Sequence, residues 1–201
     1  MLLGDVWSAI DEGRYEDAEA LLKRDDELSR APAGQMALGY IFAFRGHFDE
    51  ARHVYASLRE TAREHPERMR EYIAVHQLGV VERMAGRLDA ALALFEEEYG
   101  LIDPDADHAL AVNAYELGQV ALLMGRLDDA ERELTRCLTL ARSGDDPVAL
   151  GCAWRGLGDL AVIREDYGGA SGAYAHAKEA FREADDHRAL RELEERERAL
   201  P

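Results

Sequence analysis

The stretches GRLDAALALF at residues 86–95 and GRLDDAEREL at residues 125–134 begin with nearly the same six letters. Their first glycines, at positions 86 and 125, stand 39 residues apart. A Leu-Gly pair precedes each stretch, and such pairs recur along the chain at spacings of 39 or 40 residues. The pairs are Leu38-Gly39, Leu78-Gly79, Leu117-Gly118 and Leu157-Gly158. A constant period of this length indicates an array of structural repeats.

Each copy of the repeat places the same residue types at the same offsets around a break. The Gly at the break is followed by an apolar residue, an Ala, and a larger apolar residue four positions beyond that Ala. The larger residues are Leu22, Tyr55, Phe95, Leu134 and Tyr174. Glycine adopts the left-handed conformation that ends a helix, and apolar residues three or four apart share one helix face. The repeat therefore predicts two antiparallel helices joined by a tight turn.

Three further features refine this helix pair. The Gly of each Leu-Gly pair lacks a Cβ, so it allows the two helices to approach closely. We expect Asp49, Asp89 and Asp128, which follow the apolar turn residue, to accept backbone N–H groups at the start of the second helix. Glu165 replaces Gly at the fifth break, so we expect a different turn there.

The sequence between the breaks favours helices throughout. Apolar residues recur every three or four positions, and no segment alternates β-branched residues as a strand does. The prolines Pro32, Pro66, Pro104 and Pro147 fall between the periodic segments, where a helix ends. Together these features predict an all-α protein.

The fifth copy carries the fullest version of the pattern. Its residues are Trp154, Leu157, Gly158, Ala161, Tyr167, Ala170, Tyr174 and Ala177. This series resembles the tetratricopeptide-repeat family, in the longer-repeat form found in kinesin light chains and bacterial peptide-sensing regulators. The resemblance implies a right-handed superhelical solenoid of antiparallel helix pairs, with about five repeats and a C-terminal capping helix.

We expect this solenoid to form a single domain over residues 1–201. Its repeats are expected at residues 1–31, 32–70, 71–110, 111–150 and 151–184. The capping helix is expected at residues 187–200, where Leu190, Leu193 and Leu200 form one apolar stripe. The alternative, a helix that binds a partner, requires that stripe to be exposed.

The resemblance also implies a concave groove, lined by the first helix of each repeat, that takes a peptide or a helix. The family's geometry assigns to this groove Tyr40, Phe44, His76, Arg83, Tyr115, Gln119, Arg155 and Asp159. The apolar residues Leu123 and Ile163 fall on the same face.

Structural alternatives stay open for several of these groove residues. Tyr40 and Phe44 are one helical turn apart. The alternative for them is that their rings pack under a neighbouring helix and are not exposed in the groove. His76 has the alternative of an ordinary solvated or hydrogen-bonded histidine. Arg155 and Asp159, also one turn apart, have the alternative of pairing with each other.

The charge and composition exclude several classes of partner. The chain has 24 Lys and Arg against 41 Asp and Glu, a formal charge of −17. Such a surface repels phosphate backbones, so we expect no nucleic-acid partner. No apolar run approaches the length of a membrane span, and the N-terminus lacks the basic region of a secretory signal. Cys137 and Cys152 lie in apolar helical patterns, which favours a reducing, cytoplasmic setting.

Catalytic motifs do not appear in the sequence. The seven histidines are scattered, no His-Glu-x-x-His or paired-Cys spacing occurs, and no Gly-rich phosphate loop is present. We therefore expect no enzyme, no metal and no cofactor. The predicted function is a protein-interaction module, an adaptor or regulatory scaffold that binds a peptide or helix of a partner protein. The alternative is a structural solenoid that self-associates, for example as a homodimer, through its groove or its end.

Overall fold

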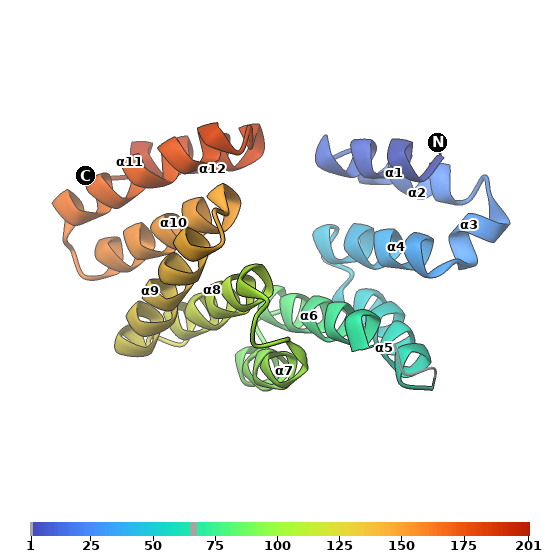
Figure 1. The fold of residues 1–201 in the computed structure, drawn as a ribbon. Coiled ribbons are helices and arrows are strands. Elements are labelled where there is room, and N and C mark those ends of the chain that lie inside the picture. Colours follow the sequence, from blue (N-terminus) through green and yellow to red (C-terminus); the bar gives the residue numbers. More distant parts are fainter. Residues whose placement is uncertain (1, 65–67) are drawn as a thin grey trace. The chain divides into compact units, whose positions relative to one another are not determined.

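The computed structural model describes residues 2–64 and 68–201. Throughout these residues the elements are helices that pack consecutively along the chain, and none is a strand (Figure 1). This confirms the all-α prediction and the solenoid of helix pairs. Pro66, one of the prolines between the predicted helices, lies outside the described residues.

The contacts of the chain fall into two compact units, Met1–Leu101 and Ile102–Pro201. The N-terminal unit contains α1 (Leu2–Asp11), α2 (Tyr15–Leu22), α3 (Asp26–Arg30), α4 (Pro32–Phe44), α5 (Phe48–Glu64), α6 (Arg68–Met84) and α7 (Leu88–Leu101). The C-terminal unit contains α8 (Asp107–Leu123), α9 (Leu127–Ser143), α10 (Pro147–Ile163), α11 (Tyr167–Glu183) and α12 (His187–Arg198). The single domain expected over residues 1–201 stays a prediction.

Each hairpin of the repeat turns through a residue in the left-handed conformation. Gly46, Gly86 and Gly125 have φ angles of 77°, 73° and 71°. Glycine adopts these angles without the steric cost that a Cβ brings, as the repeat predicted. Glu165 adopts the same conformation, with φ 60°. The expectation of a different turn there is therefore wrong: the hairpin of α10 and α11 keeps the common geometry and places a strained glutamate in it.

The glycine of each Leu-Gly pair lies directly against the large residue of the second helix. A Cβ added to Gly79 would lie 2.6 Å from the Phe95 ring, and one added to Gly158 would lie 2.3 Å from the Tyr174 ring. Carbon atoms normally stay about 3.5 Å or more apart. Only glycine therefore permits this helix spacing, which confirms the reason inferred for the Leu-Gly pairs.

Aspartate residues cap several helices, although not at the positions expected. Asp128 lies in the first turn of α9, whose N-cap residue Arg126 makes no side-chain cap bond. Asp128 instead pairs with Arg164 at 3.4 Å. The side chains that accept backbone N–H groups at helix starts belong to Asp25, Asp146, Asp166 and Asp186. Each of these is the residue directly before its helix and satisfies an otherwise unpaired donor.

The last helix, α12, closes the C-terminal unit. Leu193 is fully buried in a core cluster with Phe181 and Tyr174 of α11, and Leu190 and Leu200 pack against the same cluster. The apolar stripe of α12 is thus turned inward, as expected of a capping helix and not of an exposed partner-binding one.

Candidate functional site

In the N-terminal unit, the predicted groove residues Tyr40 and Phe44 meet aromatic residues of the first two helices. The Tyr40 and Phe44 rings stack with their centroids 4.3 Å apart. Trp7 of α1 meets Tyr40 edge-on at 5.8 Å, and Tyr15 of α2 stacks on Phe44 at 5.9 Å. Aromatic pairs at such distances add about 0.5–1.5 kcal/mol each beyond their burial. The four rings form one half-buried ladder, so α1 and α2 cover part of this face of α4.

The predicted groove residues His76 and Arg83 both lie on α6, in different environments. His76 Nδ1 lies 3.0 Å from Oε1 of Glu98 on α7, a carboxylate that is fully buried. Its ring is 6.0 Å from that of Phe95, and its side chain is 16% exposed. Burial, assisted by the charge of Glu98, raises the pKa of neighbouring Tyr72 to about 12. His76 therefore links α6 to α7, while Arg83 is half-buried in the last turn of α6.

In the C-terminal unit, Tyr115, Arg155 and Glu192 form a hydrogen-bonded row across α8, α10 and α12. Arg155 Nη2 on α10 donates to the Tyr115 hydroxyl on α8 at 2.8 Å, and Arg155 Nη1 lies 3.2 Å from Glu192 Oε2 on α12. The guanidinium also lies over the Phe181 ring, 5.5 Å from its centroid. Burial raises the pKa of the Tyr115 hydroxyl above its ordinary value. Arg155 is consequently 13% exposed and held on several sides.

Asp159, one turn further along α10, also pairs with α12. Its Oδ1 accepts a hydrogen bond from the Tyr174 hydroxyl at 2.8 Å and another from Arg196 Nε at 3.1 Å. The alternative left open by the sequence, a pair between Arg155 and Asp159, gives way to two separate ion pairs with α12. The spacing within α10 contains no signal for these partners, because Glu192 and Arg196 lie 37 residues further along the chain.

Gln119 lies between α8 and α10. Its Nε2 atom is buried and has no hydrogen-bond partner among the described residues. A Cβ on Gly156 would lie 3.1 Å from this atom, so the amide sits close against the α10 backbone. A buried donor without a partner costs about 1–3 kcal/mol. Gln119 thus lies at the contact between α8 and α10.

Two apolar residues on the same helices remain open to solvent. Leu123 at the end of α8 is 57% exposed and Ile163 at the end of α10 is 51% exposed. The two occupy the same position in consecutive repeats, 40 residues apart, and α8 packs against α10. We call these residues, with the pocket beside Ile163, the first-helix strip of the C-terminal unit.

The pocket beside Ile163 has a volume of about 270 Å³. It is lined by Asp159, Val162, Ile163, Tyr174, Arg196, Ala199 and Leu200. The last three lie on or after α12, for which the sequence predicted a capping helix with a partner-binding helix as the alternative, and none of the three was among the predicted groove residues. The position of Leu200 on the apolar stripe was the one signal for this part of the lining.

Metal sites, disulfides and membrane-spanning helices would indicate other functional classes. In residues 2–64 and 68–201 no cluster of histidine, cysteine and acidic side chains has metal-binding geometry. Cys137 and Cys152 are free thiols, and burial raises the pKa of Cys137 to about 12. The helices of the described part of the chain are all too short or too polar to cross a membrane.

An array of consecutive helix hairpins defines a helical-repeat protein. The family model described as tetratricopeptide repeat matches residues 70–143. Residues 70–143 thus have the sequence signature of tetratricopeptide repeats, which confirms the resemblance seen in the sequence. Repeats of this family serve as scaffolds for protein–protein interaction.

One solved structure shows the same fold, and two others match it more weakly. The crystal structure of BtubC from P. vanneervenii matches with a TM-score of 0.67 and 16% identity, over 90% of this chain and 79% of that one. MamA of AMB-1 matches with a TM-score of 0.49 and 18% identity, over 89% of this chain and 88% of the other. The apo form of RapI matches with a TM-score of 0.39 and 13% identity, over 98% of this chain and 71% of that one. No curated protein matches the chain in sequence.

Proposed function

We propose that this protein is an interaction module, an adaptor or regulatory scaffold, that binds a peptide or helix of a partner protein on the first-helix strip of the C-terminal unit. The observation that carries the proposal is the exposure of Leu123 and Ile163 at equivalent positions of neighbouring helices. Covering the exposed half of each side chain contributes about 1 kcal/mol at about 25 cal/mol per Å². Two such contacts at a helical-repeat spacing suit an apolar partner segment.

The polar groups of the strip supply selectivity. Asp159 and Arg196 line the pocket beside Ile163 and are already paired with each other. A partner residue that enters this pocket therefore meets an apolar wall with one ion pair at its edge. A charged partner side chain would compete with this ion pair and leave one charge unpaired, which costs binding free energy. The pocket therefore selects an apolar partner side chain over a charged one.

The proposal also assigns roles to the predicted groove residues, and these roles differ between the two units. Tyr115, Gln119 and Arg155 are each half-buried at the contact between α8 and α10, so we assign them to holding these two helices together. In the N-terminal unit, Tyr40 and Phe44 present only the part of the aromatic ladder that α1 and α2 leave uncovered. His76 of α6 lies at the repeat position of Tyr115, and Arg83 lies at that of Leu122. Both are assigned to the binding face of the N-terminal unit.

The proposal also specifies what the protein does not bind. Its charge of −17 argues against nucleic acid, and the free, buried thiol of Cys137 suits a reducing cytoplasm. We infer a non-enzymatic role because the titratable residues described above are engaged in contacts between helices. The biological effect of the protein then depends on the partner protein that it binds.

The proposal is tested by affinity capture from host lysate, with quantitative mass spectrometry of wild type beside Leu123→Ser/Ile163→Ser. The matched control is Val148→Ser, which removes an apolar side chain of the same unit that is 44% exposed and lies outside the pocket. We expect partner proteins captured by wild type and by Val148→Ser to be lost with the double variant. Equal capture by all three proteins would overturn the proposal.

Self-association is the second candidate, because an exposed apolar strip is also suited to the same strip of a second copy. Size-exclusion chromatography with light scattering separates the two functions. A wild-type dimer that becomes a monomer in Leu123→Ser/Ile163→Ser, but not in Val148→Ser, would assign the strip to a homodimer. A wild-type monomer that captures a partner assigns it to heterologous binding.

A further inference from the structure

An open groove of about 680 Å³ lies in the N-terminal unit between α5 and α7, with buried residues of α6 at its base. Its lining includes Arg52, Arg59, Leu78, Glu82, Arg87 and Leu94. None of these residues belongs to the predicted groove or to the first-helix strip of the C-terminal unit. The α5–α7 groove, as we call it, is therefore a second surface of the molecule.

The α5–α7 groove is cationic. Three of its lining side chains are arginines, and Glu82, which is 5% exposed, is an acidic one. The Glu82 carboxylate accepts hydrogen bonds from Nε of Arg52 and from Nε of Arg87. Arg59 lies two helical turns from Arg52 on the same face of α5, about 10 Å along the helix axis. These guanidinium groups contrast with the formal charge of −17 on the whole chain.

Two of the three guanidinium groups have N–H donors that are not in use. Arg52 uses all three of its side-chain nitrogens on carboxylates. Arg87 uses only Nε, so in the described part of the chain its Nη1 and Nη2 have no partner, and its side chain is 41% exposed. Arg59 donates through Nη2, while its Nε is buried and unpartnered among the described residues. An unsatisfied donor in a native protein commonly marks the place of a ligand, an ion or an ordered water.

The equivalent surface of the C-terminal unit has the opposite charge. A shift of 79 residues carries the pair Leu78-Gly79 to Leu157-Gly158, so it relates equivalent positions of the two units. The shift converts Arg52, Arg59, Glu82 and Arg87 to Glu131, Leu138, Ala161 and Asp166. Leu138 belongs to a buried core cluster there, and Asp166 caps α11. The repeat therefore folds without the arginines, and such a local departure from a repeated pattern is expected at a functional site.

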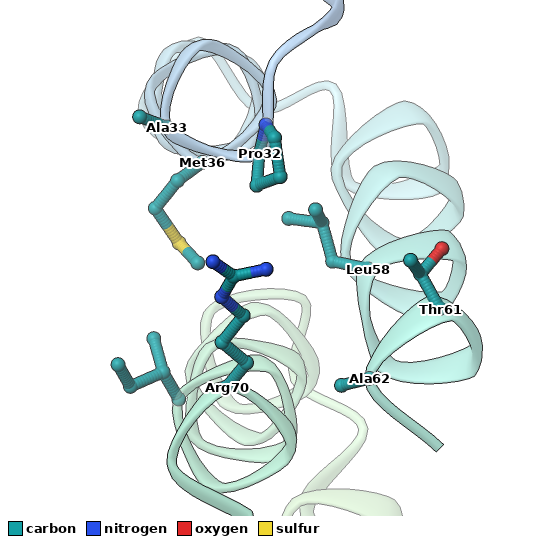
Figure 2. A pocket seen from close by; sticks show the side chains of 8 residues that line it. Pro32, Ala33, Met36, Leu58, Thr61, Ala62 and Arg70 are labelled. Carbon is teal, nitrogen blue, oxygen red and sulfur yellow. The ribbon is translucent and has the colours of Figure 1, made fainter. Parts of the chain in front are cut away.

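The smaller pocket of the N-terminal unit does not share this property. It has a volume of about 230 Å³ and opens between the start of α4, the end of α5 and the start of α6. Figure 2 shows the Arg70 side chain directed into it, between Met36 and Leu58. Arg70, the cation in the described lining of this pocket, already interacts with another group. We therefore assign no charged ligand to it.

We propose that the α5–α7 groove binds an acidic segment of a partner protein, in which apolar residues separate two carboxylate side chains. Arg87 and Arg59 donate to the two carboxylates, because the planar guanidinium fork matches a carboxylate. The apolar residues between them pack on Leu78 and Leu94. Arg87 and Arg52 share one carboxylate, so the two ends of the groove are about 10 Å apart, the length of about three residues of an extended chain. The acidic residues of the partner are thus three positions apart.

The first test is selection of a random twelve-residue peptide library, displayed on phage, against the full chain. We expect wild type to enrich peptides with two acidic residues three positions apart and apolar residues between them. The charge of −17 on the chain would by itself attract basic peptides, so enrichment of acidic ones requires a local cationic site.

The second test measures the affinity of an enriched peptide by fluorescence anisotropy. Hydrogen bonds between charged groups are the strong ones, so Arg59→Gln/Arg87→Gln should bind the peptide at least about tenfold more weakly than wild type. The matched control is Arg63→Gln/Arg126→Gln. Arg63 pairs with the same Glu97 as Arg59, Arg126 has the repeat position of Arg87, and neither is in the described lining of the groove. The control should bind as wild type does.

A third variant separates loss of binding from loss of folding. Arg59→Leu/Glu82→Ala/Arg87→Asp copies the residues that occupy the equivalent positions of the C-terminal unit, where the helix hairpins form with them. We expect this variant to keep the helical circular dichroism spectrum of wild type and to lose the peptide. If it folds and binds the peptide as wild type does, the groove is not the site.

This site is independent of the first-helix strip, so Leu123→Ser/Ile163→Ser should bind the peptide as wild type does. Enrichment of peptides without acidic residues, or equal binding by wild type and Arg59→Gln/Arg87→Gln, would contradict the proposal. Two other occupants would also overturn it. One is inorganic phosphate that binds while no acidic peptide is enriched. The other is a second copy of the chain, shown by a wild-type dimer that dissociates in Arg59→Gln/Arg87→Gln.

Discussion

The close approach of Gly158 to Tyr174 predicts that one added methyl group destabilises the C-terminal unit. A Cβ at position 158 would lie 2.3 Å and 2.5 Å from two ring carbons of Tyr174, a side chain that is 2% exposed. The ring must move by about 1 Å to restore normal contact, and its hydroxyl bond to Asp159 moves with it. Overpacking of this kind costs about 3 kcal/mol, while Ala gains about 1 kcal/mol over Gly in helix propensity. We expect Gly158→Ala to lose about 2 kcal/mol.

Gly172→Ala is the matched control for this substitution. It makes the same chemical change in the middle of α11, where a Cβ meets nothing within 4 Å. Only the propensity effect remains, so we expect a gain of about 1 kcal/mol. The two substitutions should therefore differ in sign and by about 3 kcal/mol in total.

The assay is urea denaturation followed by the fluorescence of Trp154, which stacks on His176 of α11 at 4.7 Å. The chain has two tryptophans, so the measurement is made in a Trp7→Phe background. Trp154 then reports the unfolding of the α10 and α11 hairpin. A Gly158→Ala protein as stable as its parent, or more stable, would refute the steric argument for the Leu-Gly pairs.

Three further substitutions test the turn, the core and one ion pair. Glu165→Gly should raise the melting temperature by about 2–4 °C, because it relieves about 1 kcal/mol of left-handed strain; a lower melting temperature would show that the turn carries no strain. Leu193→Ala should lower the stability of the C-terminal unit by about 2–5 kcal/mol in urea denaturation, since it leaves a cavity at a fully buried site; a loss below about 1 kcal/mol would mean that α12 does not close the core. The Lys23 ammonium, and beyond it Arg45, hold the pKa of Glu19 below its ordinary value. The stability that Glu19 contributes is therefore present above its unfolded pKa and lost as the pH falls through the folded pKa. The difference in melting temperature between wild type and Glu19→Gln should stay constant near neutral pH and shrink below about pH 4; a difference that does not change with pH would contradict this assignment.

Most of the local architecture was predictable from the repeat. The helices, their tight turns and the glycine contacts depend on residues within one copy of the pattern, so they are visible as spacings in the chain. Gly125 is an example, because a helix end that needs positive φ selects glycine whatever lies nearby. Glu165 shows the limit: the hairpin keeps its geometry even where the favoured residue is missing.

The candidate site was predictable only in part. The exposed Leu123 and Ile163 were placed on the binding face by their repeat positions. Contacts that cross between repeats were not predictable in this way. The partners of Arg155 and Asp159 come from α12, a segment whose charges resemble those of any solvated helix.

The sequence by itself determined the repeated helix pair, because its period and residue types act over a few turns of helix. Only the tertiary structure decided which equivalent positions are open. Arg70 and Ala149 occupy the same place in the repeat, yet one borders a pocket and the other a closed core. Exposure at such a place depends on the summed volume of side chains from three helices, and a spacing along the chain contains no measure of that sum.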